Sequence, residues 1–143
     1  MNVAAILKGK GNAVSTVTAD EALVDVARIL AEQHIGALVV VDAGEQIAGI
    51  ISERDVIKTL ARSGDQTLSL LVADVMTKNV ITCKQSDTLQ ELMSMMTANR
   101  FRHLPVTDEG RLVGIVSIGD VVKHHIAEVE MEASALRSYI ATG

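Results

Sequence analysis

The sequence predicts a fold of the α/β (α+β) class, in which two copies of a β-α-β-β-α unit are followed by a C-terminal helical extension. The first observation is a repeated phrase, since "GIISERDVIK" (49–58) returns as "GIVSIGDVVK" (114–123) with six of the ten letters in place. The second is that short β-branched segments alternate with stretches whose apolar residues recur at helical spacing. The third is that polar and glycine-containing turns separate these segments.

The repeat keeps a constant register. Residues 21–42 align with residues 87–108 at an offset of 66, because 87 − 21 and 108 − 42 are both 66. Gly49 and Gly114 are 65 apart, so the first copy holds one extra residue, which we place in the turn "DAGEQ" (42–46). A turn is where a duplicated fold tolerates an insertion best.

Each copy predicts the same order of elements. A β-branched strand comes first and a helix second; two apolar runs of strand length follow, joined by a turn at Gly44 or Gly110, and a last helix begins near Glu53 or Ile118. The expected segments, in pairs, are "VSTV" and "NVITC", "ALVDVARILAEQ" and "LQELMSMMTAN", "GALVVVD" and "HLPVTD", and "IAGIIS" and "LVGIVS".

The domain boundaries follow from the repeat. We assign residues 1–63 to the first repeat, 64–70 to a linker, 71–127 to the second repeat and 128–143 to the helical extension. The polar stretch "ARSGDQTLS" (61–69) leads from one repeat to the next. A unit of about 60 residues buries little core by itself, so we expect the two repeats to pack together.

Composition narrows the classes of function. The 143 residues are 48% hydrophobic but include one Phe, one Tyr and no Trp, so the surface lacks the stacking platforms that single-stranded nucleic acid uses. A net charge of −5 argues against duplex DNA or an anionic membrane as the partner. One cysteine allows no disulfide framework, the N-terminus is too short in its apolar part for a signal peptide, and no stretch approaches the roughly 18 apolar residues of a membrane span. We expect a soluble cytoplasmic protein.

A Ser-x-x-Asp pair closes the repeated phrase in both copies, as Ser52 with Asp55 and Ser117 with Asp120. One interpretation is a helix capping box, in which the Ser side chain accepts from the first-turn amides. The other is a nucleotide site, because the carboxylate can accept from both ribose hydroxyls while free amides face phosphate. Both roles can coexist at the same residues.

These residues resemble a known family. The duplicated "GIISERD" and "GIVSIGD", the "RHLPV" before the second of them and the order of elements are similar to a tandem pair of cystathionine β-synthase (CBS) domains, also called a Bateman module. The resemblance runs from about Val3 to about Ile126, and the chain looks like a stand-alone bacterial member. It implies a pseudo-two-fold disc with two clefts between the repeats, which bind adenosine-containing ligands such as AMP, ADP, ATP, NAD(H) or S-adenosylmethionine.

The resemblance also implies which residues form each cleft. The Ser and Asp of the turn would hold the ribose, the segment entering the first strand of the opposite repeat would border the adenine, and the start of the second strand would line the cleft. The matching residues are Ser52, Asp55, Ser117 and Asp120 for the ribose, Ser15, Thr16, Val80 and Ile81 for the adenine, and Ile35, Gly36, Ala37, Phe101, Arg102 and His103 along the second strands.

The two clefts are expected to differ in charge. At the start of the second strand the first copy has Gly36 and Ala37, whereas the second copy has Arg102 and His103. We expect this pair to face a phosphate in the cleft of the second turn, because a guanidinium forks onto phosphate oxygens, with His103 strengthening binding toward mildly acidic pH. In the other cleft we expect Arg54, on the turn itself, to be the nearest cation.

Other motifs give no catalytic or metal site. "GKGNAV" (9–14) begins like a dinucleotide fingerprint but has no strand before it, so we interpret its glycines as a flexible lead into the first strand, with a place near the ligand as the alternative. His124 and His125 are adjacent and would point about 100° apart on a helix, so they cannot chelate one metal. Cys83 is interpreted as a small buried apolar group. We assign no metal, no catalytic residue and no catalytic cofactor.

The C-terminal tail carries a narrow apolar seam at helical spacing, for which two arrangements are open. It can pack back on its own module, or it can pair with a second chain. The seam consists of Ile126, Val129, Ala133, Leu136 and Ile140.

The sequence therefore favours a non-catalytic regulatory module. It would bind AMP, NAD(H) or another adenine nucleotide, act as an energy or redox sensor, form a homodimer and regulate a protein that the sequence does not identify. The first alternative is a structural dimerisation module whose clefts stay empty. The second is a small enzyme that acts on a nucleotide.

Overall fold

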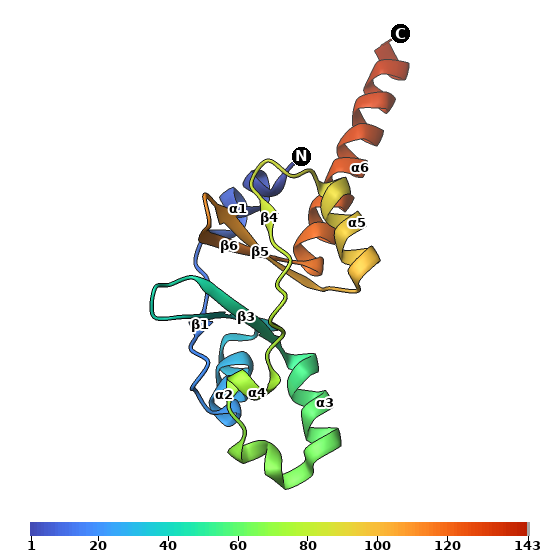
Figure 1. The fold of residues 1–143 in the computed structure, drawn as a ribbon. Coiled ribbons are helices and arrows are strands. Elements are labelled where there is room, and N and C mark those ends of the chain that lie inside the picture. Colours follow the sequence, from blue (N-terminus) through green and yellow to red (C-terminus); the bar gives the residue numbers. More distant parts are fainter. Residues whose placement is uncertain (143) are drawn as a thin grey trace.

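The computed structural model describes residues 1–142 and has two lobes, one above the other in Figure 1. The lower lobe is built mainly from the first repeat and the upper lobe mainly from the second. The elements of the first half are α1 (Val3–Lys10), β1 (Thr16–Val17), α2 (Leu23–Gln33), β2 (Ala37–Val41), β3 (Ile47–Ser52) and α3 (Glu53–Ser63).

The second half repeats this order after a short 3₁₀ helix, η1. The α/β class, the two repeats and the long last helix are confirmed. The elements are η1 (Gly64–Ser69), α4 (Val72–Val75), β4 (Cys83–Lys84), α5 (Leu89–Asn99), β5 (His103–Asp108), β6 (Arg111–Ser117) and α6 (Ile118–Thr142).

Each lobe holds one three-stranded mixed sheet, in the order β1-β2-β3 or β4-β5-β6. The first strand is parallel to the second, and the second is antiparallel to the third. The strand registers match between the lobes. Val17 pairs with Val40 in the first lobe and Cys83 pairs with Val106 in the second, and each residue of the second pair lies 66 positions after its equivalent in the first. The third strand therefore delivers its Ser to the same place in both lobes, immediately before the last helix.

Each lobe takes one short helix from the other repeat into its core. Val3, Ile6 and Leu7 of α1 are buried in the core of the second lobe, and Val72 of α4 is buried in the core of the first. This exchange of helices joins the two lobes, so the two repeats pack together as we expected from the small core of a single repeat. The exchanged segments are joined to their hosts by isolated bridges between Asn2 and Thr88 and between Ala22 and Leu71.

Two segments differ from the sequence prediction. Residues 3–10 form a helix that the sequence did not predict, so the first two residues of the expected flexible lead (9–14) are helical; Asn2 caps the first turn of this helix and its apolar face has a core to pack against. Residues 64–69 form a 3₁₀ helix rather than an open linker, with Thr67 buried against the lobe. Cys83 is buried as expected, and burial raises its thiol pKa to about 12.

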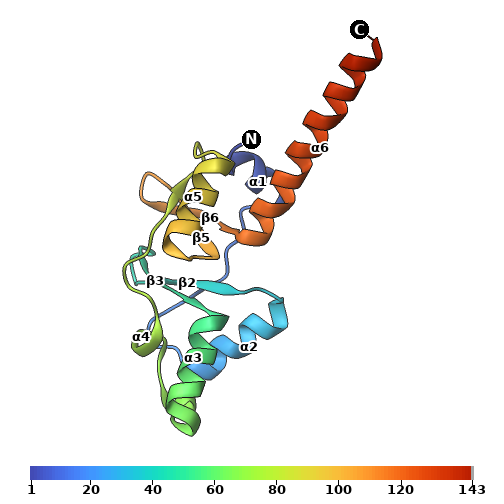
Figure 2. The same cartoon turned by 90° about the vertical axis from the view of Figure 1, so that its right-hand side faces the viewer.

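Helix α6 continues past the second lobe and projects away from the body of the molecule (Figures 1 and 2). Its apolar seam does not pack back on the module, because the side chains of Ile126, Val129, Leu136 and Ile140 are each about half exposed or more. None of the helices within residues 1–142 combines the length and the apolar character needed to cross a membrane.

Candidate functional site

Two cavities lie between the lobes, with volumes of about 530 and 490 Å³. The first contains the turn at Ser52 and is closed on the other side by residues of the second repeat. The second contains the turn at Ser117 and is closed by residues of the first repeat. Each cavity thus needs both repeats, and each has a volume suited to one small ligand.

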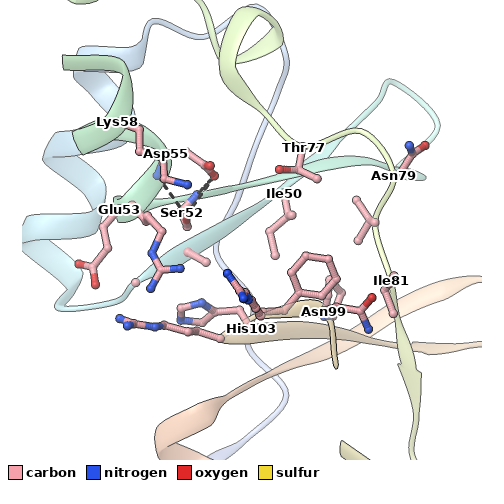
Figure 3. A pocket seen from close by; sticks show the side chains of 18 of the residues that line it. Ile50, Ser52, Glu53, Asp55, Lys58, Thr77, Asn79, Ile81, Asn99 and His103 are labelled. Carbon is pink, nitrogen blue, oxygen red and sulfur yellow. Dashed lines mark hydrogen bonds between the residues drawn. The ribbon is translucent and has the colours of Figure 1, made fainter. Parts of the chain in front are cut away.

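The first turn is a helix cap whose carboxylate faces the first cavity (Figure 3). The Ser52 amide and hydroxyl both donate to Asp55 Oδ2, at 2.9 and 3.0 Å, and the Asp55 amide donates back to the Ser52 hydroxyl at 3.3 Å. The capping box expected from the sequence is therefore present. Since these bonds use Oδ2, the Oδ1 oxygen remains to accept from a ligand hydroxyl.

The second turn repeats this geometry and adds a lysine. Ser117 donates to Asp120 Oδ2 at 2.9 and 3.0 Å. Lys10 Nζ, from the end of α1, lies 2.7 Å from the same oxygen and 3.0 Å from the carbonyl oxygen of Ile115. Burial opposes ionisation of Asp120, but the bonds from Lys10 and Ser117 outweigh it and hold the pKa of the carboxyl below its ordinary value.

Most of the residues proposed from the sequence lie against these cavities, and two do not. Thr16 lies outside both linings, and so does Asp120, whose carboxylate is paired with Lys10, a lining residue of the second cavity. The first cavity is lined by Gly36, Ala37, Ser52, Arg54, Asp55, Val80, Ile81, Phe101, Arg102 and His103 of the predicted set, and the second by Ser15, Ile35, Gly36, Ala37, Arg102, His103 and Ser117.

The distribution of positive charge differs from the prediction. Arg102 was assigned to the second cleft, but it lines both cavities. Arg54, the cation expected nearest to the phosphate of the first cleft, lines that cavity together with Lys58 and Arg100. Arg102 immediately precedes β5, and both it and His103 border the two cavities.

His103 lies between the two cavities, against the first repeat. A Cβ atom placed on Gly36 would lie 2.9 Å from two atoms of the His103 ring and 3.5 Å from Glu53 Oε1, so glycine is what allows this approach. Burial lowers the pKa of His103, against the raising effect of Glu53. Protonation of His103, and with it any gain in phosphate binding, is therefore shifted to lower pH than the sequence suggested.

Sequence reasoning missed several cavity residues. Asn79 and Asn99 line the first cavity from loops and helix ends whose placement depends on the packing of the two lobes. Lys10 was missed because the helix that carries it was not predicted. The charged residue between two glycines in "GKG" (9–11) was the available signal.

The chain is similar to known proteins that contain CBS domains. A family model described as "CBS domain" matches residues 12–62 and 72–126. The CBS-domain containing protein ATU1752 from Agrobacterium tumefaciens is similar in structure, with a TM-score of 0.86 and 45% identity, over 87% of this chain and 99% of that one. The CBS domain-containing protein CBSX3, mitochondrial, of Arabidopsis thaliana is 36% identical over 96% of this chain and 71% of its own length.

One similar structure contains ligands. The CBS domain pair of protein MJ0100, in complex with 5′-methylthioadenosine and S-adenosyl-L-methionine, has a TM-score of 0.74 and 26% identity, covering 90% of this chain and 98% of that one. Both ligands of that protein contain an adenosine group.

Proposed function

The chain belongs to the CBS-domain family, and on this premise we propose that it is a non-catalytic regulatory module that binds an adenine nucleotide, AMP or NAD(H), in the clefts between its repeats. The observation that carries the proposal is the pair of Ser-x-x-Asp turns, each placed at a cavity that both repeats close. A ligand bound there contacts both lobes at once.

The turns have the chemistry to hold a ribose. In the first cleft, Asp55 Oδ1 remains for a ligand because the Ser52 bonds use the other oxygen. An ionised carboxylate is a strong acceptor for hydroxyl donors. The adenine would lie between the apolar side chains of Val80 and Ile81 and those of the opposite lobe. The ligands of the related MJ0100 domain pair, both adenosine derivatives, support this choice.

The cations at the first cavity favour a ligand with phosphate. Arg54, Lys58, Arg100 and Arg102 all line it. One guanidinium group can donate two parallel hydrogen bonds to two oxygens of a phosphate, whereas an ammonium group has no such planar pair of donors. AMP and NAD(H) combine this phosphate with the adenosine group that the rest of the cavity suits.

Regulation requires that the ligand bind one conformation of the module more tightly than another. Because each cavity is closed by both repeats, a ligand that draws the lobes together would also move the exchanged helices α1 and α4. We propose that this movement reports the energy or redox state of the cell to a partner protein.

The experiment that tests the proposal is a thermal-shift panel combined with mass spectrometry of small molecules released from the purified protein. An adenine nucleotide at about 100 times its dissociation constant should stabilise the fold by about 2.7 kcal/mol, which raises Tm by about 5 to 10 °C for a domain of this size. Guanosine monophosphate serves as the control. No shift with AMP, NAD, ATP or S-adenosylmethionine would leave the dimerisation module as the function.

The exposed seam on α6 supports a homodimer. An apolar stripe of this length is costly to leave in water, and a second copy of the helix offers the same stripe. We expect Val129→Glu with Leu136→Glu to convert the dimer into a monomer in light scattering. Ser138→Glu, on the opposite face of the helix, should leave it dimeric. A double variant that stays fully dimeric would place the contact on other helices.

A further inference from the structure

The segment "GKG" (9–11) breaks the correspondence between the two repeats. Leu7 packs on Gly114 in the same way that Met76 packs on Gly49, and these two glycines occupy equivalent positions. From Leu7 to the buried strand residue Val17 the chain takes 10 steps (17 − 7), whereas from Met76 to the equivalent Cys83 it takes 7 (83 − 76). The first copy therefore carries three extra residues beside the second cleft.

The extra residues place an ammonium group where the other cleft has a backbone amide. In the first lobe, the carbonyl of Ile50 accepts from the Thr77 N–H at 2.9 Å. In the second lobe, the equivalent carbonyl of Ile115 accepts from Lys10 Nζ at 3.0 Å. Gly11 makes this possible by ending α1 at φ 98°, a conformation that side chains rarely allow.

The position of Lys10 gives the second cleft a property that the first lacks. Its ammonium group lies 2.7 Å from Asp120 Oδ2, with both side chains only partly exposed. A neutral nucleoside that approaches Asp120 meets a carboxylate whose charge is already paired at Oδ2, which weakens the remaining Oδ1 as an acceptor. A nucleotide brings a second anion, to which the flexible lysine can turn. No atom lies within 4 Å of a Cβ at Gly9 or Gly11, so the space on both sides of Lys10 is open.

We propose that Lys10 is a specificity-determining residue of the second cleft, which makes that cleft select phosphate-bearing adenine nucleotides over the neutral nucleoside. This inference rests on the proposed function, because it assumes that the clefts bind adenosine compounds. In the first cleft no lysine is paired with Asp55 among the described residues, so its carboxylate is open to adenosine as well as to AMP, although the cations of that cavity still favour AMP. Adenosine should accordingly fill one cleft and AMP two.

The test is an NMR titration that observes the two clefts separately, through the amides of Arg54 for the first and Gly119 for the second. In the wild type, AMP should shift both amides. Adenosine should shift Gly119 only at concentrations at least about tenfold higher than AMP does, because adenosine lacks the phosphate and so loses one charged interaction. In Lys10→Met the AMP-to-adenosine preference at Gly119 should fall by about tenfold or more, while Arg54 keeps its response. Lys10→Arg retains the charge and should retain the preference.

Lys8→Met is the matched control, because Lys8 lies on the same helix, is exposed and lines neither cavity. It should behave as the wild type, and a thermal melt of each variant checks that α1 stays folded. An unchanged preference at Gly119 in Lys10→Met, with normal shifts at both amides, would overturn the inference and leave the proposed function intact. The absence of any shift at either amide with either ligand in the wild type would overturn the proposed function, and the inference with it.

Discussion

The two turns of this molecule are built alike, yet they meet a ligand in different electrostatic states. Their internal hydrogen bonds agree closely, at 2.9, 3.0 and 3.3 Å in the first and 2.9, 3.0 and 3.2 Å in the second. Only the second carries a lysine on its carboxylate. The two repeats therefore share the Ser and Asp hydrogen bonds that cap the helix, and they differ in the charged residue that contacts the Asp carboxylate.

The helices that follow the two turns also differ. α3 has 11 residues and ends at Ser63, whereas α6 has 25 and continues past the second lobe into solvent. Both helices expose apolar side chains, Ile57 and Leu60 on α3 and Ile126, Val129, Leu136 and Ile140 on α6, but those of α6 lie on an arm that projects from the body of the molecule (Figures 1 and 2). Substitutions at equivalent positions of the two repeats therefore test whether the two clefts and lobes differ in binding and stability.

The largest expected effect concerns the arginines. Because Arg102 lines both cavities and Arg54 only the first, Arg102→Ala should weaken AMP in both clefts, and Arg54→Ala in one. A charged hydrogen bond contributes about 1.5 to 3 kcal/mol, which is roughly a ten- to hundredfold loss of affinity. Adenosine binding should change little in calorimetry. Equal losses for AMP and adenosine would assign Arg102 to the fold or the base pocket instead.

A pair of glycines tests how each lobe packs against its exchanged helix. A Cβ on Gly49 would lie 2.8 Å from the backbone oxygen of Thr77, which cannot move away, whereas a Cβ on Gly114 meets only side-chain atoms of Leu7, the nearest at 2.7 Å. Gly49→Ala should therefore destabilise the fold by about 1 to 3 kcal/mol, and Gly114→Ala by less. Urea unfolding at equal m-values measures both. The opposite order would show that the Leu7 contact is the more rigid one.

The smallest effect is the pH dependence of the Lys10–Asp120 pair. Since the folded pKa of Asp120 is lowered, its contribution to stability is present above the pKa of Asp in the unfolded chain, about 3.9, and is lost as pH falls through the lower folded pKa. For a partly exposed pair this contribution is about 0.2 to 1 kcal/mol. The stability difference between wild type and Lys10→Met should thus be largest at neutral pH and shrink on acidification. A difference independent of pH would mean that Lys10 stabilises through its aliphatic stem alone.

The sequence was sufficient for the repeats, the order of helices and strands along the chain and the Ser-x-x-Asp caps, because each depends on local pattern and on a duplication visible by eye. It did not predict α1, since the apolar residues of 3–10 are too few to form an amphipathic helix without the core of the opposite lobe. For the same reason it could not place Lys10 on Asp120, a contact across 110 residues. The sharing of Arg102 by both cavities also depends on the packing of the lobes, which local patterns do not encode.

The proposed function requires that each of the two turns hold one adenine nucleotide, and calorimetric stoichiometry measures how many nucleotides bind. Asp→Asn removes the charge that a ribose diol needs while keeping an oxygen for the helix cap. Asp74→Asn, a first-turn carboxylate that caps α4 outside both cavities, is the control. We predict two equivalents of AMP for the wild type and Asp74→Asn, one for Asp55→Asn or Asp120→Asn, and none for the double variant. A double variant that binds two equivalents with wild-type affinity would contradict the account.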